Sequence, residues 1–183
     1  LRDPLLALLD EEDLNNLSSV RRGLIFDSCF RSNHTKMIDP YPAYKRLSDL
    51  YKYHELNGEA SLDFLSGQYL ADLLVWYHLV WCGESVRRSS ELVVNLMAKG
   101  SHFTLADRRL LFDLIGKTIQ GLIPRYRSLA NSGQIEISTT PHYHPIVPLL
   151  IDFKVARECM PGVSLPEAPC YPGGLKRASF HIT

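Results

Sequence analysis

Apolar residues recur three to four positions apart over residues 62–81, the spacing of an amphipathic helix: Leu70, Leu73, Leu74, Tyr77 and Trp81. Asp72 and His78 lie outside this apolar stripe, so the pattern predicts them on a more polar face. Gly83 is well placed to end the helix, because glycine adopts the left-handed backbone at little cost. The segment is the clearest helix that the sequence predicts.

A second long helix is predicted to begin at Thr104 and to end at the turn formed by residues 131–133. Thr104 followed by Asp107 is typical of a capping box at a helix start. One wide apolar face continues along the whole segment: Leu111, Leu114, Ile115, Leu122, Ile123, Tyr126 and Leu129. Pro124 should kink this helix, because proline has no N–H for the backbone hydrogen bond.

The pattern changes at residues 134–138, where polar and apolar residues alternate strictly. The two isoleucines would point to one face and Gln134, Glu136 and Ser138 to the other, which predicts a β-strand. Three prolines within residues 141–148 exclude a helix or a central strand there. Short elements are predicted at residues 149–151 and 152–159, and residues 160–183 are interpreted as loop.

A strand after a long amphipathic helix favours an α/β layer, such as a barrel of parallel strands covered by helices. Glu136 would then face the barrel interior, where a carboxylate has to be paired, solvated or used. Glu136, His142, Tyr143 and His144 together supply hydrogen-bonding groups and an aromatic face suited to a sugar. A structural interpretation is equally compatible: Glu136 pairs with an arginine, and His144 satisfies backbone groups in the loop. The His142-x-His144 spacing also resembles part of a zinc site, but no further histidine or cysteine supports it.

Composition excludes some functions. Lys plus Arg and Asp plus Glu number 20 each, and a net charge of zero predicts no affinity for nucleic acid or an anionic membrane. The pair Arg108-Arg109 is interpreted as a solvated helix face. No apolar run approaches the length of a membrane span. The four cysteines are scattered without a C-x-x-C pair, which favours a reducing compartment, so we expect the cytoplasm.

Several short motifs in order resemble glycoside hydrolase family 57. GQIEIS at residues 133–138 and TTPHYHPIVPLL at residues 139–150 are similar to consecutive signature runs of that family. MIDPYPAY at residues 37–44 resembles its M-I-x-P-Y-P-x-Y turn, and WYHLVW at residues 76–81 resembles its W-F-N-L-A-W helix. IPRY at residues 123–126 also fits. The likeness extends over about residues 14–171, and many motifs in order are more specific than any one of them.

The resemblance implies a partial (β/α)7 barrel as the fold and an α-glucan as the substrate, processed with retention of anomeric configuration. It implies a glutamate nucleophile and an aspartate acid/base, both on strands after the matched region, and an H-Q-P motif before it. This chain contains no H-Q-P, and we expect neither catalytic residue within it. Only Glu136 and, less directly, His144 carry over as substrate-binding residues. No metal and no cofactor are expected.

We therefore interpret residues 1–183 as one partial catalytic domain, inactive alone, from a retaining hydrolase or transferase. Two departures from the family stand out: His142 replaces an aromatic residue, and the likeness stops at residues 172–183. The first residue is Leu1, so we expect the natural N-terminus to be missing, and we attribute the divergent tail to truncation or a frame change near Pro172. The alternative is a non-catalytic, helix-rich carbohydrate-binding or scaffold protein.

Overall fold

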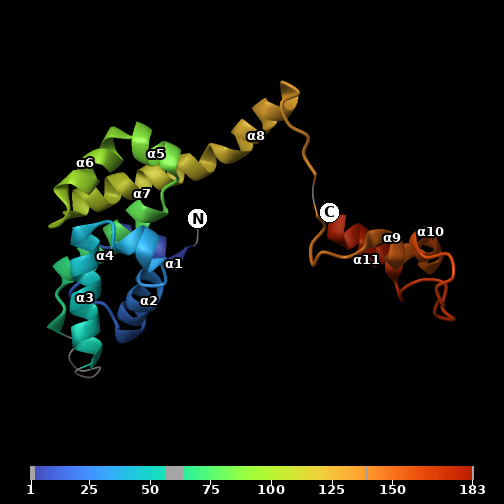
Figure 1. Ribbon diagram of the computed structural model, residues 1–183, viewed down its shortest axis with the longest axis horizontal. Helices are drawn as coiled ribbons and strands as arrows, with labels where there is room; N and C mark the ends of the chain where they lie inside the picture. Colours follow the sequence, from blue (N-terminus) through green and yellow to red (C-terminus); the bar gives the residue numbers. More distant parts are fainter. Residues whose placement is uncertain (1–2, 57–63, 139, 183) are drawn as a thin grey trace. The chain divides into compact units, whose positions relative to one another are not determined.

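The computed structural model describes residues 3–56, 64–138 and 140–182, and the chain forms two compact units (Figure 1). We call Leu1–Arg125 the N-terminal unit and Tyr126–Thr183 the C-terminal unit. Within the described ranges every regular element is a helix. Residues 62 and 63, at the start of the first predicted helix, lie outside these ranges.

The N-terminal unit contains nine helical elements among its described residues: α1 (Pro4–Ala7), η1 (Leu8–Asp10), α2 (Ser19–Cys29), η2 (His34–Ile38), α3 (Pro42–Leu56), α4 (Gly67–Trp81), α5 (Glu84–Ser89), α6 (Glu91–Lys99) and α7 (Leu105–Gln120). The helix α8 (Leu122–Asn131) contains the boundary between the units. The described residues of the C-terminal unit then form α9 (Val147–Ile151), η4 (Phe153–Val155), α10 (Ala156–Cys159) and α11 (Gly174–Ile182).

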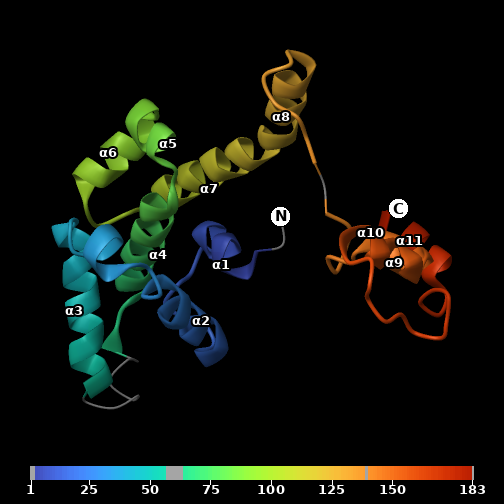
Figure 2. The ribbon, with the colours of Figure 1, turned by 45° about the vertical axis from the view of Figure 1, so that its right-hand side comes forward.

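The helix α4 is the centre of the N-terminal unit. It contacts α2, α3, α6, α7 and the η1 turn, which surround it (Figure 2). Twelve of its 15 residues are buried, so no polar face remains. The predicted helix is confirmed, but the prediction of a more polar face with Asp72 and His78 is wrong, because both side chains are buried. Each of these polar side chains must therefore find its partners inside the protein.

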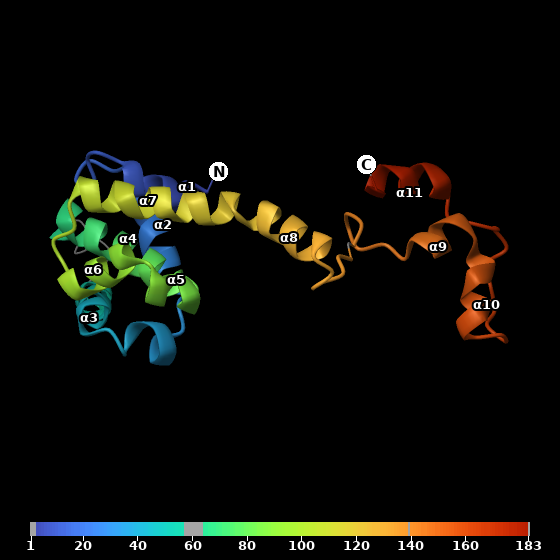
Figure 3. The same ribbon diagram turned by 90° about the horizontal axis from the view of Figure 1, so that it is seen from above.

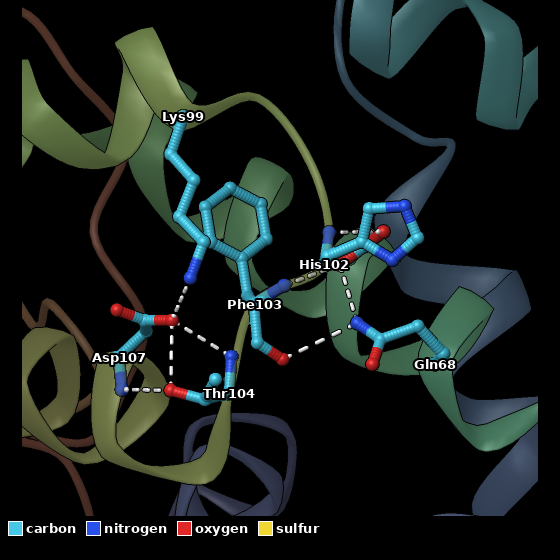
Figure 4. A network of polar contacts seen from close by, with 7 residues as sticks. Gln68, Lys99, His102, Phe103, Thr104 and Asp107 are labelled. Carbon is cyan, nitrogen blue, oxygen red and sulfur yellow. Dashed lines mark hydrogen bonds and ion pairs between the residues drawn. The ribbon is translucent and has the colours of Figure 1, made fainter.

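Local sequence signals determine where the helices begin and end. Ser66 caps α4 by accepting a hydrogen bond from the Tyr69 amide, at 3.2 Å. Thr104 and Asp107 form the predicted capping box at the start of α7, which is confirmed (Figure 4). Gly100 ends α6 with a left-handed φ of 75°. These caps satisfy backbone groups that a helix end leaves without intrahelical partners.

Asp72 binds the loop between α6 and α7 to α4 through hydrogen bonds. Its carboxylate accepts hydrogen bonds from the backbone amides of His102, at 3.0 Å, and Phe103, at 2.9 Å. Gln68, one turn earlier on α4, donates to the same carboxylate at 2.9 Å. It also donates to the Phe103 carbonyl at 3.2 Å (Figure 4). The loop can therefore hold His102 at a φ of 58°, a conformation that L-residues rarely adopt.

Arg108 binds the N-terminal segment to α7. Its guanidinium donates to the carbonyls of Leu8, Leu9 and Glu11, at 3.2, 3.2 and 2.8 Å. Figure 3 shows α7 running along this segment. The interpretation of the pair Arg108-Arg109 as a solvated helix face is thus wrong for Arg108, which is buried, and right for Arg109, which is exposed. The backbone carbonyls of a distant segment stabilise the buried charge, and no local pattern encodes them.

His78 is buried near the C-terminal end of α4. Its Nδ1 lies 2.7 Å from the carbonyl oxygen of Leu74, an acceptor, so Nδ1 carries the hydrogen of the neutral ring. Burial lowers the pKa of His78 below 6.5, and the bond to Leu74 opposes only part of this shift. His78 is therefore held neutral in the folded protein near pH 7.

The segment predicted as one helix kinked at Pro124 is divided into two helices three residues earlier, at Gly121. The helix α7 ends at Gln120, and α8 begins at Leu122 after the single residue Gly121. Pro124 has no N–H to donate to the carbonyl of Gln120, which is four residues earlier. The predicted apolar face continues into α8, but it is exposed there, with Ile123 at 67%.

In the C-terminal unit, α9 and α11 pack side by side. Gly174 makes this possible: a Cβ on it would lie 1.6 Å from the Leu150 carbonyl oxygen of α9. Ala178, one turn later, is buried on the same face of α11. The interpretation of residues 160–183 as loop is therefore wrong for α11, whose two small residues create a flat packing face.

The predicted α/β fold, a partial (β/α)7 barrel, is also wrong. Among the described residues there is no strand, and residues 135–138 have no regular structure. Ile137, which should pack against helices, is 62% exposed. The alternation at residues 134–138 separates polar from apolar side chains correctly. However, a strand exists only when a neighbouring strand pairs with its backbone, and the described chain offers none.

The Asp72 network predicts a large effect of Asp72→Asn on stability. The amide group turns a hydrogen-bond donor toward donors of the loop, so we expect the free energy of unfolding to fall by about 2–3 kcal/mol. Urea denaturation followed by circular dichroism measures this value. Asp49→Asn on the exposed side of α3 is the matched control, and an equal loss in both variants would contradict the role of the network.

The neutral state of His78 predicts a pH dependence of stability. Below about pH 6.5 the unfolded chain takes up a proton that folded His78 does not, so the free energy of unfolding should fall as the pH falls. His78→Asn retains a donor for the Leu74 carbonyl but cannot titrate. Denaturation is measured at several pH values between 7.5 and 5.5, on the order of one unit either side of the ordinary histidine pKa. The free energy of unfolding should change less with pH in the variant than in the wild type. Identical slopes would exclude His78 as the cause.

Candidate functional site

Glu136 lies in the irregular connection between α8 and α9. The amide of Gln134 donates to the Leu129 carbonyl, at 3.0 Å, as the chain leaves α8. Beyond it the Glu136 side chain is exposed and has no hydrogen bond or ion pair with the described residues. The structural interpretation, in which an arginine of this chain pairs with Glu136, thus has no support within the described part. The expected barrel interior is absent from that part, so the role of Glu136 in binding sugar stays a prediction.

His144 lies in a tight turn eight residues further along. Its amide donates to the carbonyl of Pro141, at 2.9 Å, and its side chain is exposed. Tyr143 and His144 have φ values of 63° and 56°, which are unfavourable for residues with a Cβ. The ring of Tyr143 is 82% exposed and lies 4.1 Å from that of His142. The turn therefore presents these side chains to solvent instead of burying them.

A pocket of about 450 Å³ lies in the C-terminal unit, between Tyr143, the residues that directly precede α11 and the helix α11 itself. Besides Tyr143 it is lined by Pro172, Gly173, Lys176, Arg177, Phe180 and His181. Glu136 and His144 do not line it. Sequence analysis missed these residues because the segment was interpreted as loop. The four-residue spacing of Lys176 from Phe180, and of Arg177 from His181, was the available signal of a common helix face.

A second hollow, of about 260 Å³, lies in the N-terminal unit between the end of α4, α5 and α7. Its walls are mostly apolar, with Val86, Leu114 and Ile115 among them, and His78 contributes a polar group. Cys82 also lines it, and burial raises the pKa of this thiol above 9.0. The cysteine is therefore a poor nucleophile near neutral pH.

The described ranges contain neither a metal-binding cluster nor a membrane-spanning helix. No three or more histidine, cysteine, aspartate or glutamate residues there gather closely enough to hold a metal ion, so His142 and His144 lack further ligands in that part of the chain. No helix in the same ranges combines the length and apolar character needed to cross a membrane.

Comparison with protein families identifies the chain. Searches of curated proteins and of solved structures gave no match. The sequence model of glycosyl hydrolase family 57 matches residues 8–164, which include the GQIEIS run with Glu136, the turn with His144 and the helix α4. The resemblance predicted from the motifs is thereby confirmed, and the matched region ends ten residues before α11 begins. Because the match covers most of its length, the chain belongs to glycoside hydrolase family 57.

Proposed function

We propose that this chain contributes to substrate binding in a retaining glycoside hydrolase or glucanotransferase that acts on α-glucans in the cytoplasm. The observation that carries the proposal is the family match, since it includes the run around Glu136. Membership indicates glycosidase chemistry, and α-glucans are the substrates that the motifs imply. Hydrolysis and transfer differ in whether water or a sugar accepts the glycosyl group.

Glu136 and His144 are the residues that we assign to the glucan. An ionised carboxylate accepts hydrogen bonds from two vicinal sugar hydroxyls, and an imidazole either donates or accepts one. Both side chains are exposed, and Glu136 has no competing partner in the described part of the chain. Its oxygens are thus free to bind hydroxyl groups.

Bond cleavage needs groups that we place outside this chain. Retention of configuration requires a nucleophile and an acid/base whose carboxyls are about 5 Å apart. Family likeness assigns these to a glutamate and an aspartate after the matched region, and the H-Q-P motif is absent from the sequence. The chain is therefore proposed to bind sugar but not to cleave it.

A second candidate is a non-catalytic, helix-rich carbohydrate-binding or scaffold protein. The contiguous helical core of the N-terminal unit favours it, because such a core needs no barrel strands to be buried. Thermal denaturation distinguishes the two. A monomer with one sharp transition supports the second candidate, whereas aggregation through uncovered apolar faces supports a fragment of a larger domain.

The isolated chain is expected to leave starch and maltooligosaccharides intact. Reducing-end release and chromatography of maltoheptaose after long incubation measure this directly. The control is a complete family enzyme in the same buffer. Turnover by the chain alone would overturn the proposal that its reacting carboxyls lie elsewhere.

Glu136→Ala is expected to weaken catalysis when this chain is joined to the rest of a catalytic domain. The loss should be comparable to a charged hydrogen bond, roughly 1.5–3 kcal/mol in kcat/KM on maltooligosaccharides. Glu167→Ala, an exposed glutamate beyond the family match, is the matched control. Equal kinetics for the wild type and Glu136→Ala would refute the assigned role.

A further inference from the structure

The 450 Å³ pocket in the C-terminal unit is mostly built from residues beyond the family match. Six of its seven lining residues follow residue 164, and Tyr143 alone belongs to the matched region. The family likeness therefore assigns no role to this pocket as a whole. Its ligand has to be inferred from its own chemistry.

The charge lining the pocket is positive. Lys176 and Arg177 lie in the first turn of α11, where the described helix has no acidic residue, and no carboxylate lines the pocket. Helix N-termini are themselves electropositive, so acidic residues are usual there and two cations are unfavourable without an anion. Neither cation forms a salt bridge with the described residues, whereas many cations of the N-terminal unit do.

Arg177 is already oriented. Its Nε donates to the Pro172 carbonyl, at 3.2 Å, and its guanidinium carbon lies 5.4 Å from the centre of the Tyr171 ring. These contacts leave the two terminal nitrogens for a ligand. A held guanidinium loses little side-chain entropy when it binds, which suits the bidentate recognition of a phosphate.

The other walls of the pocket are aromatic. The rings of Tyr143 and Phe180 each lie 5.9 Å from that of His181 and are 82% and 70% exposed. Two exposed aromatic faces in one pocket are suited to a ligand that has an apolar ring face. The Nδ1 atom of His181 is buried and has no hydrogen-bond partner among the described residues, although buried polar atoms normally have one.

We propose that this pocket binds a small phosphorylated sugar. The phosphate contacts Lys176 and Arg177, the sugar ring packs against Tyr143 and Phe180, and a hydroxyl group bonds with His181 Nδ1. The phosphate distinguishes this ligand from the neutral glucan assigned to Glu136 and His144. The inference is independent of that assignment, because neither residue lines the pocket.

Isothermal titration calorimetry of the 183-residue chain tests the proposal with three probes at low ionic strength: glucose 6-phosphate, glucose and inorganic phosphate. Glucose 6-phosphate should bind more tightly than either of the others, and added salt should weaken it. Lys176→Gln should weaken binding at least about tenfold, the loss expected for a charge-assisted hydrogen bond. Phe180→Ala removes an exposed ring and should weaken the binding of glucose 6-phosphate without changing the binding of inorganic phosphate.

Lys154→Gln is the matched control, because Lys154 is an exposed lysine of the same unit that does not line the pocket. Circular dichroism confirms that each variant retains its helices. No binding of glucose 6-phosphate, or equal binding of glucose 6-phosphate and inorganic phosphate, would overturn the proposal. An equal effect of Lys154→Gln and Lys176→Gln would overturn it as well.

Discussion

Burial of α4 is the constraint on which the N-terminal unit depends. Once twelve of 15 residues are inside, each polar group on the helix needs an internal partner, and those partners organise the surroundings. Asp72 fastens the loop before α7, and the Trp76 indole donates to the Gly100 carbonyl at 2.7 Å, at the end of α6. Ring stacking of Tyr44 on Trp76, with centroids 6.1 Å apart, then sets α3 against α4.

The two units differ in whether their cationic side chains form ion pairs, and this difference bears on function. In the N-terminal unit, Arg109 pairs with Asp10 and Lys99 with Asp107, both at 2.5 Å, so these cations are compensated. In the C-terminal unit Lys176 and Arg177 lie beside a pocket without such pairs among the described residues. A compensated surface charge contributes little beyond local stability. An uncompensated pair beside aromatic rings is suited to an anionic ligand, which is why the pocket carries a functional inference.

Family membership and the structure inform different parts of the chain. The match covers residues 8–164, which include Glu136 and His144, the two residues for which the motif resemblance predicts sugar binding. The helical structure shows both of them exposed on irregular backbone, without a strand to direct them. The helix α11 follows the match, packs on α9 through Gly174, and lines a pocket of which only Tyr143 lies within the matched region. The residues that carry the family likeness and the residues that line the proposed ligand pocket are therefore different ones, apart from Tyr143.

Features that depend on neighbours within one helical turn could be predicted from the sequence: the capping box of Thr104 and Asp107 and a disturbance of the helix near Pro124. The ordered motifs also predicted the family. Features that depend on distant segments could not. Arg108 is buried because carbonyls about a hundred residues away accept its hydrogen bonds, and Asp72 because amides thirty residues away do. Residues 134–138 alternate like a strand, yet a strand needs a second strand to share its backbone hydrogen bonds. Tertiary packing supplied the partners of Asp72 and Arg108, whereas the described part of the chain places no second strand beside residues 134–138. Burial and strand pairing each need two surfaces that meet, and a local sequence pattern describes only one of them.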